Sequence, residues 1–235
     1  MASKSGGKQP PSSREPLSKD RVLAAAVALA DKGGIRSMSM RKLGEALGVE
    51  AMSLYSHVAN KDDILDGIVD RVVGEITLPA PKTPWKAAMR QRAIAAHAML
   101  VRHPWASVLI ESRLNLGAAR LRYFNAGLGT FREAGFSVAL TYNAVLAIDS
   151  YVYGFALQEV SWPFDEEDRS EVVAAVEPQV STTDYPYVAE VMGYVMKSGA
   201  IRSAPGATRS ARYADEFEFG LALVLDGLEK RKTRP

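Results

Sequence analysis

The sequence predicts an all-α protein with a small N-terminal domain of three helices and a larger helical C-terminal domain. Apolar residues recur at helical spacing through most of the chain, and no alternating run of apolar and polar residues predicts a strand. The proline-rich segment 78–84 interrupts this pattern and predicts the boundary between the two domains. We find no internal repeat.

The N-terminal domain is expected to span residues 17–77, behind a tail. Residues 1–16 consist mainly of Ser, Gly, Pro and basic residues without periodicity, which is typical of a disordered segment. A first helix should begin after Ser18 as its N-cap. It should end at Gly33 and Gly34, because glycine readily terminates a helix.

Residues 39–61 predict two short helices joined by a tight corner. Gly48 should end the first helix in the left-handed conformation, which glycine adopts at little cost. Glu50–Val58 should form the second helix, with Leu54 and Val58 facing inward at a spacing of four. Two helices that cross steeply at a glycine corner form the helix-turn-helix arrangement, whose second helix enters the DNA major groove.

The charge distribution supports an interaction of this segment with DNA. The net charge of the whole chain is +2, which favours no particular partner. Residues 1–61 contain 10 Lys and Arg against 5 Asp and Glu, whereas residues 62–235 contain 19 against 22. The basic part coincides with the helix-turn-helix, as expected for a surface that binds phosphates. An ordinary solvated surface with a basic tail is the alternative explanation.

The C-terminal domain, residues 84–232, is helical in pattern throughout. We expect helices at Trp85–Arg102, Trp105–Arg113, Gly117–Glu133, Ser137–Glu159, 184–198 and 210–232, and a short one at 166–175. The segment 138–157 is long and nearly uncharged, but its polar residues favour a buried helix over a membrane span. No apolar signal-peptide segment is visible at the N-terminus, so we expect a cytoplasmic location and no membrane partner.

Residues along the chain resemble the TetR family of repressors. The run Leu54-Tyr-Ser-His-Val-Ala-Asn-Lys61 is the most specific part, and Met40-Arg-Lys-Leu-Gly44 precedes it in the expected order. Arg102-His-Pro-Trp105, Gly135-Phe-Ser137 and 217–229 resemble the tetracycline-repressor-like C-terminal domain. The resemblance implies DNA binding by the first domain. It also implies that the second domain dimerises and encloses a small-molecule pocket.

The proposed DNA contacts lie on the two short helices and just after them. Arg41 suits guanine O6 and N7, or a phosphate, and Lys42 should either pack along the helix or contact a phosphate. The resemblance places Ser53, Tyr55, His57 and Lys61 at phosphate or base contacts. Ala51 and Met52 are apolar and can contact only thymine methyl groups. The full set is Arg41, Lys42, Ala51, Met52, Ser53, Tyr55, Ser56, His57 and Lys61.

A homodimer is predicted because two long apolar helices exceed what one small domain needs to cover. The interface residues recur at helical spacing in these two helices. They are Val138, Ile148, Val152, Phe217, Leu221, Val224, Leu225 and Leu228, with Gly220 and Gly227 allowing close approach. The alternative is that both helices belong to the core of a monomer.

The effector pocket should be largely apolar or aromatic. Its candidate residues are Gln91, His97, Leu109, Arg113, Phe124, Tyr142, Val145, Tyr151 and Gln158, with Trp162 as a lid. In the tetracycline repressor a histidine and a glutamate hold a magnesium–drug complex, and the corresponding residues here are Leu109 and Gln158. We therefore expect a different effector. With no cysteine and with His97 and His103 off a common helix face, we expect no metal and no cofactor.

These observations predict a repressor that releases a palindromic operator when a small molecule binds the C-terminal domain. Its partners would be double-stranded DNA, a small-molecule effector and a second copy of the chain. An enzyme is the first alternative, but no nucleophile–base arrangement, paired carboxylates or phosphate-binding glycine loop is apparent. A dimeric helical protein that binds small molecules without binding DNA is the second alternative.

Overall fold

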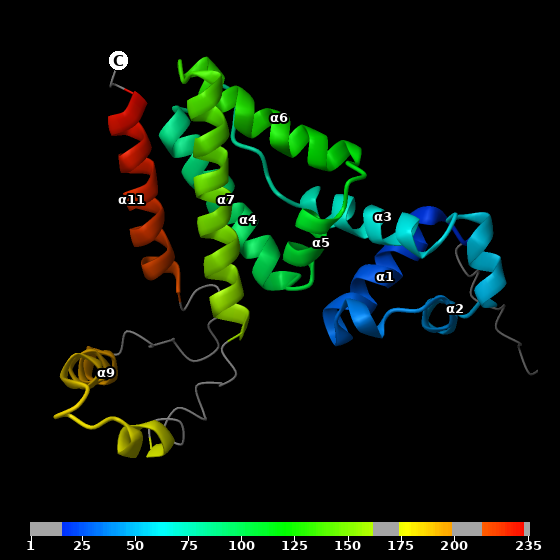
Figure 1. Cartoon of the computed structure of the whole chain (residues 1–235). Helices are drawn as coiled ribbons and strands as arrows, with labels where there is room; N and C mark the ends of the chain where they lie inside the picture. Colours follow the sequence, from blue (N-terminus) through cyan, green and yellow to red (C-terminus); the bar gives the residue numbers. More distant parts are fainter. Residues whose placement is uncertain (1–15, 162–173, 199–212, 233–235) are drawn as a thin grey trace, which may run out of the picture.

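The structure is a computed structural model that describes residues 16–161, 174–198 and 213–232 (Figure 1). Every regular element in these ranges is a helix, which confirms the predicted fold class. Trp162, all but the end of the predicted helix 166–175, and residues 1–15 of the predicted tail lie outside the described residues. We refer to residues 17–77 as the head and to residues 84–232 as the body.

The head contains three α-helices and two short 3-10 helices. In chain order they are α1 (Lys19–Gly33), η1 (Ile35–Ser37), α2 (Met40–Leu47), η2 (Ala51–Ser56) and α3 (Lys61–Val73). As predicted, Ser18 caps α1 by accepting a hydrogen bond from the Arg21 amide, and Gly34 ends it with φ of 69°. The buried faces of the three α-helices meet in one apolar core.

The second helix of the helix-turn-helix differs from the prediction. The expected α-helix over Glu50–Val58 is a six-residue 3-10 helix, although Leu54 and Val58 are buried as predicted. The Ser56 hydroxyl donates to the Ser53 carbonyl at 2.7 Å. Serine side chains often bond to nearby backbone groups, and such bonds offer the backbone an alternative to the regular α-helical hydrogen bonds.

The described elements of the body are α4 (Trp85–Arg102), α5 (Ala106–Ser112), α6 (Ala118–Glu133), α7 (Val138–Ser161), η3 (Glu177–Gln179), α9 (Pro186–Ser198) and α11 (Ala214–Lys232). Helices α4, α6, α7 and α11 pack together as a bundle, and Figure 1 shows α9 apart from them. Helix α7 packs on α4, α6 and α11. The turn from α6 to α7 has Gly135 at φ of 88°, and Ser137 caps α7 by accepting from the Leu140 amide.

Figure 1 places α2 and η2 at the opposite end of the molecule from α11. Helix α3 runs from the head to the body, where it packs against α5 and α6. Within the described ranges no single helix has the length and apolar character of a membrane span. Helices α4 and α5 have the length and apolar character of a span only when they are taken together, and a bend of 112° separates them.

Candidate functional site

The corner of the helix-turn-helix depends on two glycines. Gly48 caps α2 in the left-handed conformation, with φ of 68° and ψ of 36°, as predicted. Gly44 lies where α2 meets η2, and a Cβ atom there would be 2.7 Å from the Val49 carbonyl oxygen. This close approach requires glycine. We did not predict the role of Gly44, although a glycine inside a helix is a recognisable signal.

The predicted DNA-binding residues lie on α2, on η2, in the short segment after it and at the start of α3. Met52 and Tyr55 are 76% and 46% exposed, and Arg41, Lys42, Ser53, Ser56 and Lys61 are also exposed. Ala51 and His57 are half-buried. Seven of the nine predicted residues are therefore accessible to a partner from outside.

Arg41 makes an ion pair with Glu45 at 3.0 Å, one helical turn along α2. Both side chains are more than half exposed. Such a pair contributes only about 0.3–0.5 kcal/mol. Arg41 can therefore leave Glu45 for a DNA group with little loss of stability.

The start of α3 is fixed by reciprocal hydrogen bonds. The Asn60 side chain accepts from the Asp63 amide at 2.9 Å, and the Asp63 carboxylate accepts from the Ala59 amide at 3.1 Å. Lys19 of α1 pairs with Asp63 at 2.8 Å. Lys19 and the Ala59 amide lower the pKa of Asp63. This arrangement holds the first turn of α3, and with it Lys61, in a defined position.

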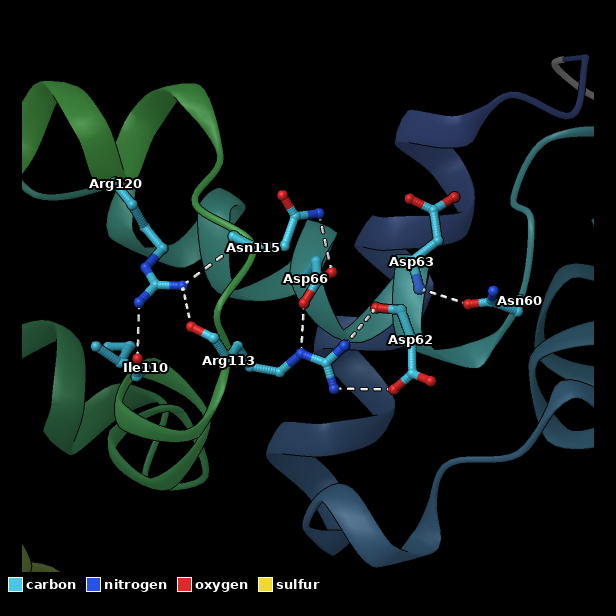
Figure 2. A network of polar contacts seen from close by, with 8 residues as sticks. All are labelled: Asn60, Asp62, Asp63, Asp66, Ile110, Arg113, Asn115 and Arg120. Atoms are coloured by element: carbon cyan, nitrogen blue, oxygen red, sulfur yellow. Dashed lines mark hydrogen bonds and ion pairs between the residues drawn. The ribbon is translucent and has the colours of Figure 1, made fainter.

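A first polar junction joins α3 to the loop between α5 and α6 (Figure 2). Arg113 forms ion pairs with Asp66 and, at 2.9 Å, with Asp62. Asn115 donates to the second oxygen of Asp66 at 3.0 Å. The hydrogen bond from Arg113 lowers the pKa of Asp66. Arg113 was predicted to line the pocket. Its long side chain instead reaches α3 and pairs with two carboxylates of the head.

A second polar junction joins the body to the ends of α1 and α3. His103 Nδ1 lies 2.7 Å from Oδ1 of Asp31, and the Trp105 ring nitrogen donates to the same oxygen at 2.7 Å. His103 Nε2 lies 3.4 Å from Glu75. The body thus holds the head at two places, one near each end of α3.

The predicted pocket residues do not converge on one site. Gln91, Tyr142 and Gln158 are exposed, Leu109 is buried, and Val145 and Tyr151 are half-buried. Phe124 does line a pocket, together with Tyr123 and Tyr153. Periodicity predicted the helices that carry these residues but did not determine which side of each helix faces inward.

His97 is buried in the centre of the body. Its ring stacks on Phe217 with centroids 4.3 Å apart and meets Phe155 edge-on. Its Nε2 atom lies 2.8 Å from a carboxylate oxygen of Glu159, which is also buried. Neither Glu159 oxygen has a well-aligned hydrogen bond to the described residues. These groups are polar features of an otherwise apolar interior.

A second buried polar cluster was not predicted. Arg92 pairs with Asp149 at 3.0 Å, and its guanidinium lies 4.1 Å from the Tyr123 ring centre. Burial raises the pKa of Tyr123, and it raises that of Tyr153. Both phenols therefore stay protonated. Because Arg92 and Asp149 are 57 residues apart, the sequence offered no signal that they meet.

Most of the predicted dimer residues are buried within a single chain, and this part of the prediction is wrong. Ile148, Val152, Phe217, Leu221, Leu225 and Leu228 are buried, and Val224 is half-buried. They form part of the chain's own core, where α11 packs on α7 and α4. Gly220 serves this contact, because a Cβ atom there would lie 2.7 Å from Cζ of Tyr151.

The opposite face of the same two helices is apolar and exposed. Val138, which was predicted at the interface, is 70% exposed, and Phe219 and Leu223 are 70% and 60% exposed. Tyr142, Leu146 and Leu157 of α7 are exposed as well. Exposed apolar side chains on two adjacent helices are typical of a protein–protein interface.

Comparisons with known proteins agree with this architecture. Residues 22–68 match the family described as bacterial regulatory proteins, tetR family, and residues 78–232 match the tetracyclin repressor-like C-terminal domain. An HTH-type transcriptional regulator of Saccharopolyspora erythraea is 34% identical over 174 residues, which are 74% of each chain. The HTH-type transcriptional repressor DrrR1 of Streptomyces coeruleorubidus is 30% identical over 229 residues, 95% of this chain and 82% of that protein.

More distant similarities extend over nearly the whole chain. The class A tetracycline repressor from Escherichia coli is 27% identical over 219 residues, 92% of each chain. The solved structure of the regulator SCO7222 from Streptomyces coelicolor has a TM-score of 0.69 at 26% identity, covering 91% of this chain and 98% of that one. The chain therefore belongs to the tetR family, with a tetracycline-repressor-like C-terminal domain, and is a transcriptional regulator and not an enzyme.

Proposed function

We propose that the chain is a homodimeric repressor that binds a palindromic operator through its heads and releases it when a small molecule occupies its body. The observation that carries this proposal is the pair of polar junctions, at Arg113 and at His103, through which the body holds the head. Relatives that are named repressors support the direction of regulation.

The exposed face of α2 and η2 is the surface we assign to DNA. Arg41 reads a guanine edge or binds a phosphate, and Lys42 binds a phosphate. Ser53, Tyr55, His57 and Lys61 supply donors to phosphates, which fix the register of the protein on DNA. Ala51 and Met52 face the bases and contact thymine methyl groups. The Ser56 hydroxyl is already bonded to the Ser53 carbonyl, so we give it a structural role.

Two copies associate through the exposed apolar face of α7 and α11. A twofold dimer would present two reader elements separated by about 34 Å, one turn of DNA. This separation explains why the operator should be palindromic. The exposed residues Phe219 and Leu223 support this interface, and they replace most of the residues that the sequence suggested.

Release follows from a shift between two arrangements of the heads. An effector that binds more tightly to the body when the heads are spread favours the arrangement that cannot bind DNA. Helix α3 is the mechanical link, because it carries Lys61 at one end and is held through Asp62 and Asp66 by the body. The effector is apolar or aromatic, and the protein acts in the cytoplasm, where its operator lies.

The test is selection of bound genomic fragments with the purified full-length protein, followed by a gel shift on the selected sequence. We expect a palindromic site bound by a dimer. Arg41→Ala should weaken binding, whereas Arg122→Ala, which removes an exposed charge from α6, should not. A protein that selects no duplex at low ionic strength would instead be a dimeric helical small-molecule-binding protein without DNA-binding activity.

A further inference from the structure

A cleft of about 420 Å³ lies between the linker that joins the two domains and the C-terminal half of α6. Residues 79–83 of the linker form one wall, and residues of the first turn of α4 and of the range 125–134 supply the rest. Figure 1 shows the linker running alongside α6. The volume lies within the range of small-molecule sites, which often occur at domain boundaries. None of the residues predicted to hold the effector lines this cleft.

Two opposite charges line the cleft from different elements. Lys82 belongs to the linker and Glu133 to the last turn of α6, and both residues are exposed. Neither forms an ion pair with another residue of the described ranges, so both charges are available to a guest. Asn125, Gly129 and Glu133 follow one another at a spacing of four, so they share one face of α6. The Asn125 side chain also lines the cleft and has no hydrogen bond to the described part of the chain.

The backbone holds Lys82 in an unusual conformation. Its φ is 65°, and among the described residues no other residue except glycine has a positive φ. The amide and the hydroxyl of Thr83 both donate to the Ala80 carbonyl, at 3.2 Å and 2.7 Å, and thereby fix the turn that contains Lys82. Strained residues of this kind occur preferentially at ligand-binding sites. The lysine is therefore presented to the cleft by a defined turn.

Trp85 supplies an aromatic surface in the same cleft. Its ring is half-buried, and Phe131 and Phe136 pack against it with centroid distances of 5.8 Å and 5.0 Å. These contacts fix the ring, which also lines the cleft. Gly129 keeps the wall of α6 open, because a Cβ atom there would meet only Oε1 of Glu133, at 3.9 Å. An aromatic guest can pack on such a ring.

We propose that this cleft binds an aromatic amino acid in its zwitterionic form. The carboxylate pairs with Lys82, the ammonium pairs with Glu133, and the ring packs on Trp85. A zwitterion satisfies both charges at once, whereas a guest with a single charge leaves one of them without a partner. The amide of Asn125 can donate to the carboxylate or accept from the ammonium. This site goes beyond the proposed function and does not depend on operator binding.

The test is equilibrium dialysis of the full-length protein with radiolabelled L-tryptophan. Tryptamine, which lacks the carboxylate, and indole-3-propionate, which lacks the ammonium, serve as competitors. Each should compete roughly threefold less well than unlabelled tryptophan, as expected for pairs with exposed charges. Lys82→Gln should remove the advantage over tryptamine, and Glu133→Gln the advantage over indole-3-propionate. Arg122→Gln is the control, because it removes an exposed charge of α6 that does not line the cleft.

Gly129→Leu tests whether tryptophan binds in this cleft. The nearest atom to a Cβ at this position is 3.9 Å away, so the variant should fold, and its side chain should fill the cleft and abolish binding. Thermal unfolding of the variant checks that it is folded. No binding of tryptophan, equal competition by all three compounds, or full binding to folded Gly129→Leu would each overturn the inference.

A gel shift on the same preparation keeps this inference apart from the proposed function. Loss of tryptophan binding with an intact gel shift contradicts only the inference. Tryptophan binding without a gel shift on any selected duplex contradicts only the repressor.

Discussion

Arg113 donates from its guanidinium to the carboxylate of Asp66, and this contact joins residues 47 positions apart in the sequence. Arg113 lies on the loop between α5 and α6, and Asp66 lies on α3. Both side chains are less than one-fifth exposed. The contact is therefore better shielded from water than the ion pairs on the surface of the head, and its energy should be correspondingly larger.

Removing this contact should destabilise the protein. Arg113→Ala leaves the carboxylate of Asp66 and that of Asp62 without their main partner, so we expect the free energy of unfolding to fall by about 1–3 kcal/mol. Denaturant unfolding measures this change. Arg41→Ala also breaks an arginine–carboxylate pair, but an exposed one, and should change stability by less than about 0.5 kcal/mol. Equal effects of the two substitutions would contradict the assignment.

The same pair predicts a dependence of stability on pH. The hydrogen bond from Arg113 lowers the pKa of Asp66 in the folded protein below its ordinary value of 3.8. The resulting stabilisation is complete above the ordinary pKa and disappears as pH falls through the folded-state pKa. Between about pH 5 and about pH 2, Asp66→Asn should therefore lose less stability than the unsubstituted protein. Parallel curves for the two proteins would exclude Asp66 as a contributor.

Lys61 should contribute one phosphate contact. Its side chain is exposed in the first turn of α3, next to the capping residue Asn60. Lys61→Ala should weaken operator binding. It should also reduce the magnitude of the slope of log K against log salt concentration by about 0.9. Fluorescence anisotropy over a series of salt concentrations measures the slope. An unchanged slope would remove Lys61 from the DNA interface.

Gly44→Ala should damage the helix-turn-helix itself. The added methyl group would lie 2.7 Å from the Val49 carbonyl oxygen, so α2 and η2 must separate. We expect a loss of about 1–3 kcal/mol in stability and a loss of operator binding. Gly129→Ala is the control, because it lies inside α6 with only Glu133 nearby at 3.9 Å. That substitution should be neutral or stabilise the protein by up to about 1 kcal/mol.

Two leucines that are two positions apart on α11 should separate dimerisation from folding. Leu223 is 60% exposed and Leu221 is 1% exposed. Leu223→Asp should shift the protein from dimer to monomer in sedimentation equilibrium while its far-ultraviolet circular dichroism stays unchanged. Leu221→Ala should instead lower the free energy of unfolding by about 2–5 kcal/mol, the usual range for a buried leucine. A monomer produced by Leu221→Ala alone would reverse the assignment of the two faces.

Local signals predicted most of the helices and their ends. Ser18 and Gly48 act as expected, because caps and left-handed turns depend on a few neighbouring residues. The 3-10 form of η2 was missed, since six residues carry too little periodicity to distinguish it from an α-helix.

Long-range contacts were the part that the sequence could not reveal. The spacing of Leu221 and Leu225 predicted an apolar face correctly, but it could not tell a face that packs within the chain from one that meets a second copy. Arg113 was predicted to line the effector pocket, and its partners on α3 became visible only when the fold brought them together.

The contact between Tyr151 and Gly220 has a consequence for association. The Tyr151 ring occupies the space that a side chain at 220 would need, and its hydroxyl donates to the Phe217 carbonyl at 2.8 Å. Helices α7 and α11 are thereby fixed to each other before any second copy arrives. Their shared outer surface is therefore preorganised, so the proposed dimer would not have to restrict the relative motion of the two helices and would lose less entropy on forming. Packing between Tyr151 and Gly220 inside one chain thus helps to set the affinity of the proposed dimer.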